Sequence, residues 1–385
     1  MKPLKKRAAL LLSLVLLAFL ALFVIRINKE MVDFQVNRTA GARLSWGESL
    51  YRTEDGHYQF KYPPFASMLY LPLALLPLPA AKAVWFALVL LASGGAFYLS
   101  FRLASDKRKG ADWLAALPLL ILGRYFLREI QLGQINALLT CLLLIMTGLL
   151  VSAEKKRAPR SETWAGLFWG LAVALKPYAL IFLPYLVLKR KARALVSGAV
   201  FLVLAFLMPS FYYGLAGNVT VHKEWIKTLS QSTPQLLTSQ DNASLLAMFA
   251  KWTGRPHLSV QLWAVCLVLL AGFLFTIIRK GRTQENPVPL DCGLLLLFIP
   301  LISPLGWDYT FLSSVLAVGL IARHYFDFPV AGRVFLSVVS LIIPLSLYDV
   351  LGRRVYAQLM SLSAITVCFL VLAGYAAALR IKDLG

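Results

Sequence analysis

Long apolar runs alternate with short polar segments along almost the whole chain. Many of the runs approach the roughly 20 residues that a helix needs to cross the hydrocarbon core of a membrane. The pattern predicts an all-α, polytopic transmembrane helical bundle of about 12 spans. The predicted spans cover approximately residues 8–25, 81–104, 112–126, 135–151, 164–188, 194–213, 258–278, 290–302, 311–322, 334–347 and 356–379, with 164–188 counted as two short helices that meet at Lys176-Pro177.

The polar segments differ in charge from one end of the spans to the other. The basic residues of segment 2–7 precede the first run, and a further basic cluster follows every second predicted crossing. Because positively charged short loops stay in the cytoplasm, this arrangement predicts a multi-pass protein of the cell (inner) membrane with cytoplasmic N- and C-termini. It leaves residues 26–80 and 214–256 as two long external loops.

Residues 63–80, at the end of the first external loop, carry Pro72, Pro77 and Pro79, which disfavour a straight crossing helix. The next run ends at the basic cluster 106–109, which should be cytoplasmic, so an extra crossing before it does not fit. We therefore predict that residues 63–80 are re-entrant or interfacial. The chain as a whole, residues 1–385, is predicted to be one integral-membrane domain.

Composition supports this class. Hydrophobic residues make up 59% of the chain, more than is usual for a soluble domain. The net charge of +21 would point to nucleic acid in a soluble protein, but here the basic residues separate apolar runs, so membrane topology explains them and no nucleic-acid partner is expected. The four cysteines lie in apolar runs and the four histidines lack ligand spacing, so neither a metal site nor a cofactor is predicted. The N-terminal run is interpreted as an uncleaved first span, since no small-x-small cleavage site follows it.

Polar residues of several kinds collect at the predicted external ends of the spans, whereas the cytoplasmic ends hold mainly Lys and Arg. Such a mixture suits a site for a sugar and an anionic phosphate: a carboxylate acts as a base, cations bind phosphate, and amides and aromatic rings bind the sugar. The candidate catalytic residue is Asp33. The candidates for binding a donor phosphate are Lys176, Arg124 and Arg128. The candidates for binding the sugar or acceptor are Arg38, Lys61, Tyr62, Glu129, Gln134, Asn136, Asn242, Trp307 and Asp308.

Each candidate also has a structural interpretation. Asp33 lies a few residues past the first span, where a carboxylate beside a cavity is a functional candidate, but it could also cap a helix or pair with a cation. Lys176 lies at a break that is tolerated only if it lines a cavity or is buried in protein, and it could instead extend to the interface. Arg124, Arg128 and Glu129 could form an interfacial ion network.

The amides of the segment QLGQIN, Gln134 and Asn136, could cap the following span or pair between helices. Asp308 lies in SPLGWDY, a turn broken by proline and glycine, where a site role and a purely local role are both open.

An ordered set of short motifs runs through most of the chain, from about residue 30 to residue 310. Its parts are Asp33-Phe34, Gly47-Glu48-Ser49-Leu50-Tyr51, Tyr62-Pro63-Pro64-Phe65, Pro72-Leu73, Trp85, Gly133-Gln134-Ile135-Asn136, Gly170-Leu171-Ala172, Lys176-Pro177, Ser303-Pro304 and Trp307. No single motif is decisive, but the ordered set resembles glycosyltransferase family 87. That family includes mycobacterial polyprenol-phosphomannose-dependent mannosyltransferases.

The resemblance implies a GT-C type fold, a polytopic bundle whose first external loop carries a catalytic Asp or Glu. It implies transfer of a sugar, a hexose such as mannose or a pentose, from a polyprenyl-phosphate donor to a lipid or glycan acceptor on the extracytoplasmic side. The family's loop aspartate corresponds to Asp33, and its Lys-Pro segment corresponds to Lys176-Pro177. The chain departs from the family pattern at Asp308-Tyr309, where a histidine often follows the tryptophan.

The expected mechanism is a single inverting displacement without a metal. Asp33 takes the proton of the acceptor hydroxyl, and Lys176, Arg124 and Arg128 receive the leaving polyprenyl phosphate. The lipid tail of the donor is expected to lie in a groove between spans, among membrane lipids.

Two other functions fit part of the pattern. About twelve spans with a central broken helix also suit a secondary transporter, but matching broken segments in two halves are lacking and the polar residues gather at one face. A non-catalytic, lipid-binding envelope subunit is the other alternative. Loss of Asp33 should abolish transfer in an enzyme and leave the assembly of such a subunit intact.

Overall fold

A computed structural model describes residues 15, 17–105, 117–156, 158–280 and 287–381. Across this part of the chain the regular structure is helical, apart from one isolated bridge between Asn242 and Trp307. The basic segment 2–7, the cluster 106–109 and the expected start of a span at residue 112 lie outside the described residues. The predicted all-α class is confirmed.

The helices follow one another with short connections. The α-helices are α2 (Val32–Ser45), α3 (Pro64–Ala74), α4 (Leu78–Ala104), α5 (Leu117–Leu132), α6 (Asn136–Lys156), α7 (Pro159–Leu175), α8 (Phe182–Leu188), α9 (Ala192–Leu207), α10 (Ser210–Leu236), α11 (Leu245–Thr253), α12 (Pro256–Lys280), α13 (Val288–Ile302), α14 (Val315–Arg323), α15 (Val330–Leu345), α16 (Tyr348–Ser361) and α17 (Ala364–Ile381). Short 3-10 helices are η1 (Ile27–Lys29), η2 (Thr53–Tyr58), η4 (Pro177–Ile181), η5 (Asp308–Ser314) and η6 (Tyr325–Asp327).

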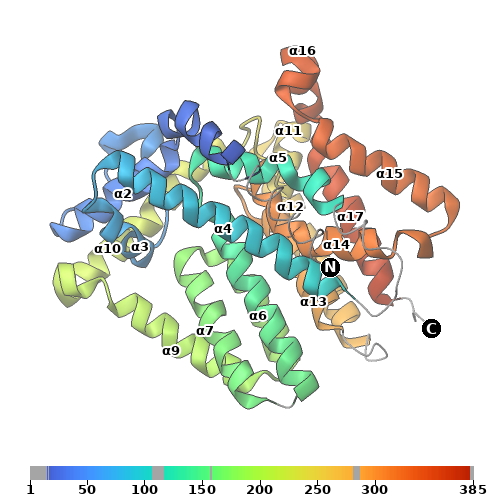
Figure 1. The fold of residues 1–385 in the computed structure, drawn as a ribbon, viewed down its shortest axis with the longest axis horizontal. Coiled ribbons are helices and arrows are strands. Elements are labelled where there is room, and N and C mark those ends of the chain that lie inside the picture. The colour runs from blue at the N-terminus through green and yellow to red at the C-terminus, as the bar shows by residue number, and fades with distance from the viewer. Residues whose placement is uncertain (1–14, 16, 106–116, 157, 281–286, 382–385) are drawn as a thin grey trace, which may run out of the picture.

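Figure 1 shows how these helices are arranged. Helix α4 runs across the molecule and packs on α6, while α6, α7 and α9 lie side by side. The pair α2 and α3 lies at one end with α10, and α15, α16 and α17 lie at the other end. The segment from η1 to α3 is therefore folded onto the end of α4, where its side chains can meet those of the α5–α6 connection.

Burial separates core helices from helices that face outwards. Nearly every residue of α13 is buried, which is the property of a helix that is apolar on all sides and surrounded by protein. Within the part of the chain that the structure describes, α4, α6, α12 and α17 are long and apolar enough to cross a membrane. The number rises to six if the bent pairs α9–α10 and α15–α16 each form one span. Most of α12 is exposed, as expected for a helix that faces lipid.

Several predicted spans match helices closely, but parts of the prediction are wrong. The predicted span 194–213 is interrupted, because α9 ends at Leu207 and α10 leaves it at an angle of 93°. Helix α5 continues to Leu132 instead of ending near Phe126, because its last turns bury Glu129 and Ile130 in the protein. The second predicted external loop is mostly helical, since it contains most of α10 and all of α11. The low mean hydropathy of residues 214–256 predicts a loop. Helix α10 has a low mean hydropathy because it is amphipathic, with polar residues on its exposed face.

The last predicted span, 356–379, is two helices instead of one. Helix α16 ends at Ser361, and Ser363 adopts a left-handed φ of 56° before α17 begins. Helix α16 is bent by 105° relative to α15. Helix α16 points away from the rest of the bundle (Figure 1), so many of its polar residues are exposed and not buried between helices.

The broken segment 164–188 has the predicted form. Helix α7 ends at Leu175, Lys176 is extended with φ −154° and ψ 112°, and η4 begins at Pro177. Proline removes a backbone donor and opposes continuation of the helix, which explains the position of the break. Helix α3, of 11 residues, forms most of the Pro-rich segment 63–80, and α4 begins at the end of this segment. Its predicted re-entrant or interfacial position stays a prediction.

Close packing holds α2 against α3. A Cβ on Gly41 would lie 2.8 Å from the carbonyl carbon of Tyr70, so only glycine allows this approach. The Asn37 amide donates to the Tyr70 hydroxyl at 3.2 Å, and Phe34 stacks on Trp85. The guanidinium of Arg38 donates to the carbonyl oxygens of Leu73, Ala74 and Leu76 at the end of α3. These contacts set the position of α2, whose first turn carries Asp33.

A buried ion group joins three other helices. Asp291 on α13 accepts from Arg380 on α17 at 2.6 Å and lies 3.3 Å from the Lys189 amine at the end of α8. The side chains of Asp291 and Arg380 are both fully buried. A buried charge pair is costly to break, so this group specifies how α8, α13 and α17 pack.

Candidate active site

The site is centred on Asp33, in the first turn of α2. Met31 takes a left-handed φ of 48°, and its N–H donates to the Gln131 carbonyl at 3.0 Å, which ties the start of α2 to the end of α5. The Gln134 amide donates to Asp33 Oδ2 at 2.7 Å. Among the described residues, no hydrogen-bond donor contacts Asp33 Oδ1, so this oxygen remains able to accept a proton from a substrate.

Gln134 connects Asp33 with two tyrosines from distant parts of the chain. The Tyr62 hydroxyl donates to Gln134 Oε1 at 2.8 Å. The Gln134 amide nitrogen also donates to the Tyr309 hydroxyl at 3.2 Å. Four residues from the first loop, the α5–α6 connection and η5 therefore form one hydrogen-bonded group, which we call the Asp33 group.

A second group lies beside it. Glu129 is fully buried and accepts from Asn136 Nδ2 at 2.9 Å and from the Ala137 N–H at 2.8 Å. Asn136 Oδ1 accepts from Lys176 Nζ at 2.7 Å and from the Tyr178 hydroxyl at 2.9 Å. Glu129 thus orients Asn136, and Asn136 orients the amine of Lys176.

Lys176 joins the two groups. Its amine lies 5.3 Å from the centre of the Tyr62 ring and 4.9 Å from that of Tyr178, so aromatic faces stabilise the cation on two sides. Its charge interacts with the carboxylates of both Asp33 and Glu129. Helix α7 ends at Leu175, and the extended backbone of Lys176 directs its side chain between the two groups. The result is a base and a cation in one half-buried polar site.

The electrostatics of the loop residues are consistent with this arrangement. Burial raises the pKa of Asp33 above its ordinary value, although the Gln134 hydrogen bond and the charges of Lys176, Arg128 and His57 oppose the rise. Burial lowers the pKa of Lys61, and the charge of Asp33 opposes that change. Arg128 is exposed and donates to the Gln131 side chain at 3.0 Å, so it lies at the edge of the site.

The other predicted site residues lie apart from these two groups. Arg124 donates to Asp308 at 2.6 Å and to the carbonyl oxygens of Ile343 and Ser346 at the end of α15. Because these contacts occupy its guanidinium, Arg124 is not available to bind a phosphate. It instead holds Asp308 and so orders the turn next to Tyr309. Arg38 contacts the end of α3, as described above.

Asn242 and Trp307 order the late turn itself. The Asn242 side chain donates to the carbonyl oxygens of Leu237 and Pro304 and accepts from the Gly306 N–H at 3.0 Å. Trp307 pairs with Asn242 through backbone contacts. Together they hold the segment that presents Asp308 and Tyr309.

Two residues of the site were not among the predicted ones. Tyr309 follows Asp308 directly, and Tyr178 lies two positions after Lys176. Both stand in segments that the sequence singled out. No group of three or more His, Cys, Asp or Glu residues in the described part of the chain is arranged to hold a metal ion.

Comparison with known proteins gives the family. The family model described as glycosyltransferase family 87 matches residues 60–304. The chain belongs to glycosyltransferase family 87. It is therefore a membrane glycosyltransferase.

Two curated relatives of this family 87 chain have the same name, polyprenol-phosphate-mannose-dependent alpha-(1-2)-phosphatidylinositol mannoside mannosyltransferase. The one from Mycobacterium tuberculosis is 30% identical over 310 residues, which is 73% of this chain and 67% of the relative. The one from Mycolicibacterium smegmatis is 29% identical, over 72% of this chain and 66% of the relative. The chain thus spans about two thirds of the length of these relatives.

Among solved structures, the crystal structure of ArnT from Cupriavidus metallidurans bound to undecaprenyl phosphate aligns with 98% of this chain and 77% of its own. The TM-score is 0.47 and the sequence identity is 14%.

The turn between α5 and α6 in this glycosyltransferase depends on Gly133. Its φ is +70°, and a Cβ there would lie 2.6 Å from Cβ of Phe34. We expect Gly133→Ala to destabilise the protein by about 1–3 kcal/mol and to lower transfer, because Gln134 is displaced from Asp33. Thermal unfolding and transfer should be measured together. Gly94→Ala is the control: apart from its chain neighbours and the backbone of its own helix, no atom lies within 4 Å of the added Cβ, so an equal loss in both variants would contradict the prediction.

The raised pKa of Asp33 predicts the shape of the pH profile. A general base must be ionised, so kcat/KM falls as the pH falls through the pKa of Asp33 in the folded protein. Because that pKa is raised, the midpoint of the acid limb is expected above 3.8. Glu54→Gln should leave the limb unchanged, since Glu54 is exposed and contacts Thr53. A midpoint at or below 3.8 would contradict the assignment.

Proposed function

We propose that this glycosyltransferase moves a hexose such as mannose, or a pentose, from a polyprenyl-phosphate-sugar donor to a hydroxyl of a lipid or glycan acceptor on the extracytoplasmic side. The main support is the single site in which Asp33 and Lys176 face each other across Tyr62 and Gln134. The dependence of both mycobacterial relatives on polyprenol-phosphate-mannose supports this class of donor.

Asp33 is the general base of the proposed reaction. Its free Oδ1 takes the proton of the acceptor hydroxyl as the oxygen attacks the anomeric carbon, while Gln134 holds Oδ2 at 2.7 Å. The new carbon–oxygen bond forms as the bond between the anomeric carbon and the phosphate oxygen breaks. One displacement inverts the anomeric centre, and the proton remains on Asp33 until it passes to solvent.

The leaving group is polyprenyl phosphate, which departs as an anion. Lys176 receives its charge, because the amine is already directed into the site by its hydrogen bond to Asn136 and by the ring of Tyr178. Arg128, exposed at the edge, adds positive charge that attracts the donor phosphate. A preorganised cation lowers the barrier because it needs no rearrangement when the charge develops.

Transfer by the full chain, reconstituted in lipid nanodiscs, tests the proposal. Labelled polyprenyl-phosphate mannose, glucose and arabinose are each supplied with a membrane lipid extract as acceptor, and the anomeric configuration of the product is determined by NMR. We expect transfer from one of these donors with inversion. Retention of configuration contradicts the single displacement, and absence of transfer from every donor contradicts the proposed donor class.

The same assay in sealed vesicles of known orientation tests the side of the membrane. Product should form only when the donor is supplied to the extracytoplasmic face. Product formed only from the opposite face would contradict the extracytoplasmic placement.

A further inference from the structure

The backbone at Tyr62 is held by two side chains that take no part in the proposed mechanism. The indole N–H of Trp225, on α10, donates to the Lys61 carbonyl oxygen at 3.0 Å. The Tyr51 hydroxyl donates to the carbonyl oxygen of Tyr62 itself at 2.6 Å. Two consecutive carbonyl groups are therefore fixed beside the ring whose hydroxyl contacts Gln134 in the active site.

The chain around Tyr62 has no regular structure of its own to fix this position. Among the described residues, residues 60–62 make no backbone–backbone hydrogen bond. Pro63 disfavours a helical conformation of Tyr62. A backbone carbonyl that is removed from water needs a hydrogen-bond donor, and Trp225 and Tyr51 supply the two donors. Their positions therefore determine where the Tyr62 ring lies.

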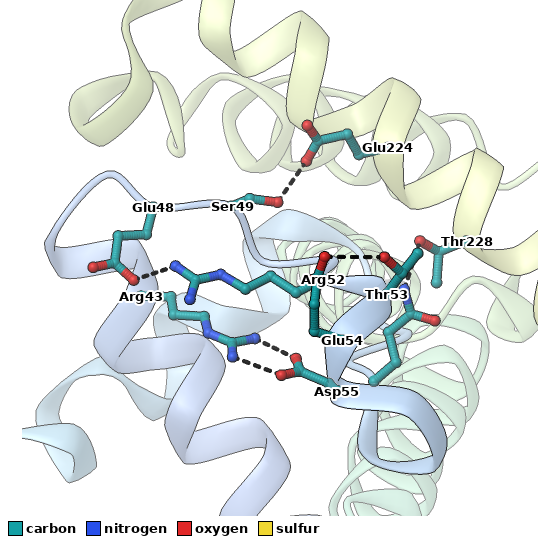
Figure 2. A network of polar contacts seen from close by, with 10 residues as sticks. Arg43, Glu48, Ser49, Arg52, Thr53, Glu54, Asp55, Glu224 and Thr228 are labelled. Atoms are coloured by element: carbon teal, nitrogen blue, oxygen red, sulfur yellow. Dashed lines mark hydrogen bonds and ion pairs between the residues drawn. The ribbon is translucent and has the colours of Figure 1, made fainter.

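The contact of Trp225 belongs to one face of α10 that follows the segment 46–62. Glu224, Trp225 and Thr228 lie three or four residues apart and so share one side of the helix. The Ser49 hydroxyl donates to Glu224 at 3.1 Å. The Gln59 amide donates to the Thr228 hydroxyl at 3.4 Å. Figure 2 shows Glu224 and Thr228 directed from α10 at this segment, so α10 holds it at several points.

The other side of the segment is attached to α2. Arg43, near the end of α2, contacts Asp55 through two guanidinium nitrogens, with one of the two distances at 2.8 Å (Figure 2). Helix α2 also carries Asp33 in its first turn. The segment thus bridges the helix that carries the base and the helix that holds the backbone at Tyr62.

Tyr62 transmits its position to the base. Its hydroxyl donates to Gln134 Oε1 at 2.8 Å, and the amide of Gln134 donates to Asp33 Oδ2 at 2.7 Å. Because both ends of the Gln134 amide are engaged, a displacement of the Tyr62 hydroxyl allows the amide to rotate away from Asp33. The same displacement moves the Tyr62 ring from its place 5.3 Å from the amine of Lys176.

We propose that Trp225 of α10 and Tyr51 are positioning residues for the reaction. By holding the backbone at Tyr62, they keep the Gln134 amide on Asp33 in the orientation that proton transfer requires. This inference rests on the proposed function. It gives α10, which supplies no side chain to the two groups of the site, the role of setting the geometry of the base.

Variants of the full chain in nanodiscs test the inference. Trp225→Phe keeps an aromatic ring and removes the indole donor, and Tyr51→Phe removes the second donor by a different route. Transfer is measured with labelled polyprenyl-phosphate mannose, glucose and arabinose and a membrane lipid extract, at equal amounts of folded protein. Both variants should lower kcat by about tenfold, the effect of a misplaced catalytic group, with donor and acceptor KM close to native.

A double variant tests whether Trp225 acts through Tyr62. Tyr62→Phe alone removes the hydroxyl that holds Gln134 and should also lower kcat by about tenfold. If Trp225 acts through that hydroxyl, Trp225→Phe combined with Tyr62→Phe also loses about tenfold, and not the roughly 100-fold expected when independent losses multiply. An effect of Trp225 on the fold alone would be independent of the Tyr62 hydroxyl and would multiply.

A second readout does not depend on transfer. The Gln134 hydrogen bond lowers the pKa of Asp33, so loss of that bond raises this pKa. Modification of Asp33 by a water-soluble carbodiimide, located by mass spectrometry over a range of pH, reports when this carboxyl is protonated. Trp225→Phe should move the midpoint to higher pH. The variant keeps the other charged groups that act on Asp33, which are Lys61, Lys176, Arg128 and His57.

Trp252→Phe is the matched control. The indole N–H of Trp252, on α11, donates to the Leu362 carbonyl oxygen at 3.3 Å, so the same substitution removes a bond of the same kind. Neither residue belongs to the two groups of the site. The control should therefore keep the native kcat and the native midpoint of Asp33 modification.

The outcomes separate this inference from the proposed function. Native kcat in Trp225→Phe, losses that multiply in the double variant, or an equal loss in Trp252→Phe overturn the inference and leave the proposed function in place. A lower kcat with an unmoved Asp33 midpoint overturns it as well. If the native chain transfers no sugar, the proposed function fails. A midpoint that still moves in Trp225→Phe then supports the positioning contact, and an unmoved one overturns it.

Discussion

Asp33→Asn is expected to lower sugar transfer by about 10²–10⁴-fold, the contribution usual for a general base. Asparagine has nearly the same shape, and it can still accept the hydrogen bond from Gln134 that holds Asp33 Oδ2 at 2.7 Å. The variant loses the ability to take a proton through the other oxygen. Since Asp33 stabilises nothing by a salt bridge among the described residues, folding should be preserved.

Transfer should be compared at equal amounts of folded protein in nanodiscs, with donor and acceptor varied separately. A loss in kcat with little change in either KM identifies a group that acts in the transition state. Glu54→Gln, which removes a carboxylate from the segment that follows α2, is the control and should retain native activity. Native activity in Asp33→Asn would exclude Asp33 as the base and direct attention to Glu129.

Lys176→Met is expected to lower transfer by about 10²–10³-fold, as for other electrostatic groups that receive transition-state charge. Methionine has a similar length and apolar stem but offers no charge to the leaving phosphate. The change has a second consequence. It leaves the buried carboxylate of Glu129 without its nearby cation, which costs about 3 kcal/mol or more of stability.

A double variant separates these two effects. Glu129→Gln combined with Lys176→Met removes both charges, so the free energy of unfolding should recover towards the native value while transfer stays low. Lys176→Arg keeps a cation and should retain more activity than Lys176→Met. If the double variant recovered transfer together with stability, the role of Lys176 would be structural and the proposed phosphate contact would be wrong.

Much of the architecture was predictable because hydropathy and helix-breaking residues act locally. The all-α membrane class follows from the lengths of the apolar runs, and the break at Lys176-Pro177 follows from proline. The order of short motifs was enough to indicate the family that the comparison shows. The prediction is wrong for α10, which is a helix in place of the predicted loop, and for α16, which is separate from α17. Both helices carry many polar residues, so hydropathy alone does not identify them.

The site was predictable only as a list of residues. Asp33, Tyr62, Gln134, Asn136, Glu129 and Lys176 were all candidates, and the structure brings them together. Arg124 and Arg38 looked equally suitable, because a cation at a membrane interface has the same sequence context whether it binds phosphate or caps a helix. Only the packing shows that Arg124 pairs with Asp308 and that Arg38 contacts the end of α3.

By itself, then, the sequence determined the class, the family and the position of the broken helix, since each depends on residues that are close together in the chain. The tertiary structure decided which polar groups meet. The Gln134 amide contacts Asp33 across a separation of 101 residues and Tyr309 across 175. Contacts over such separations depend on how α2, the α5–α6 turn and η5 pack, and no local pattern of residues specifies that packing.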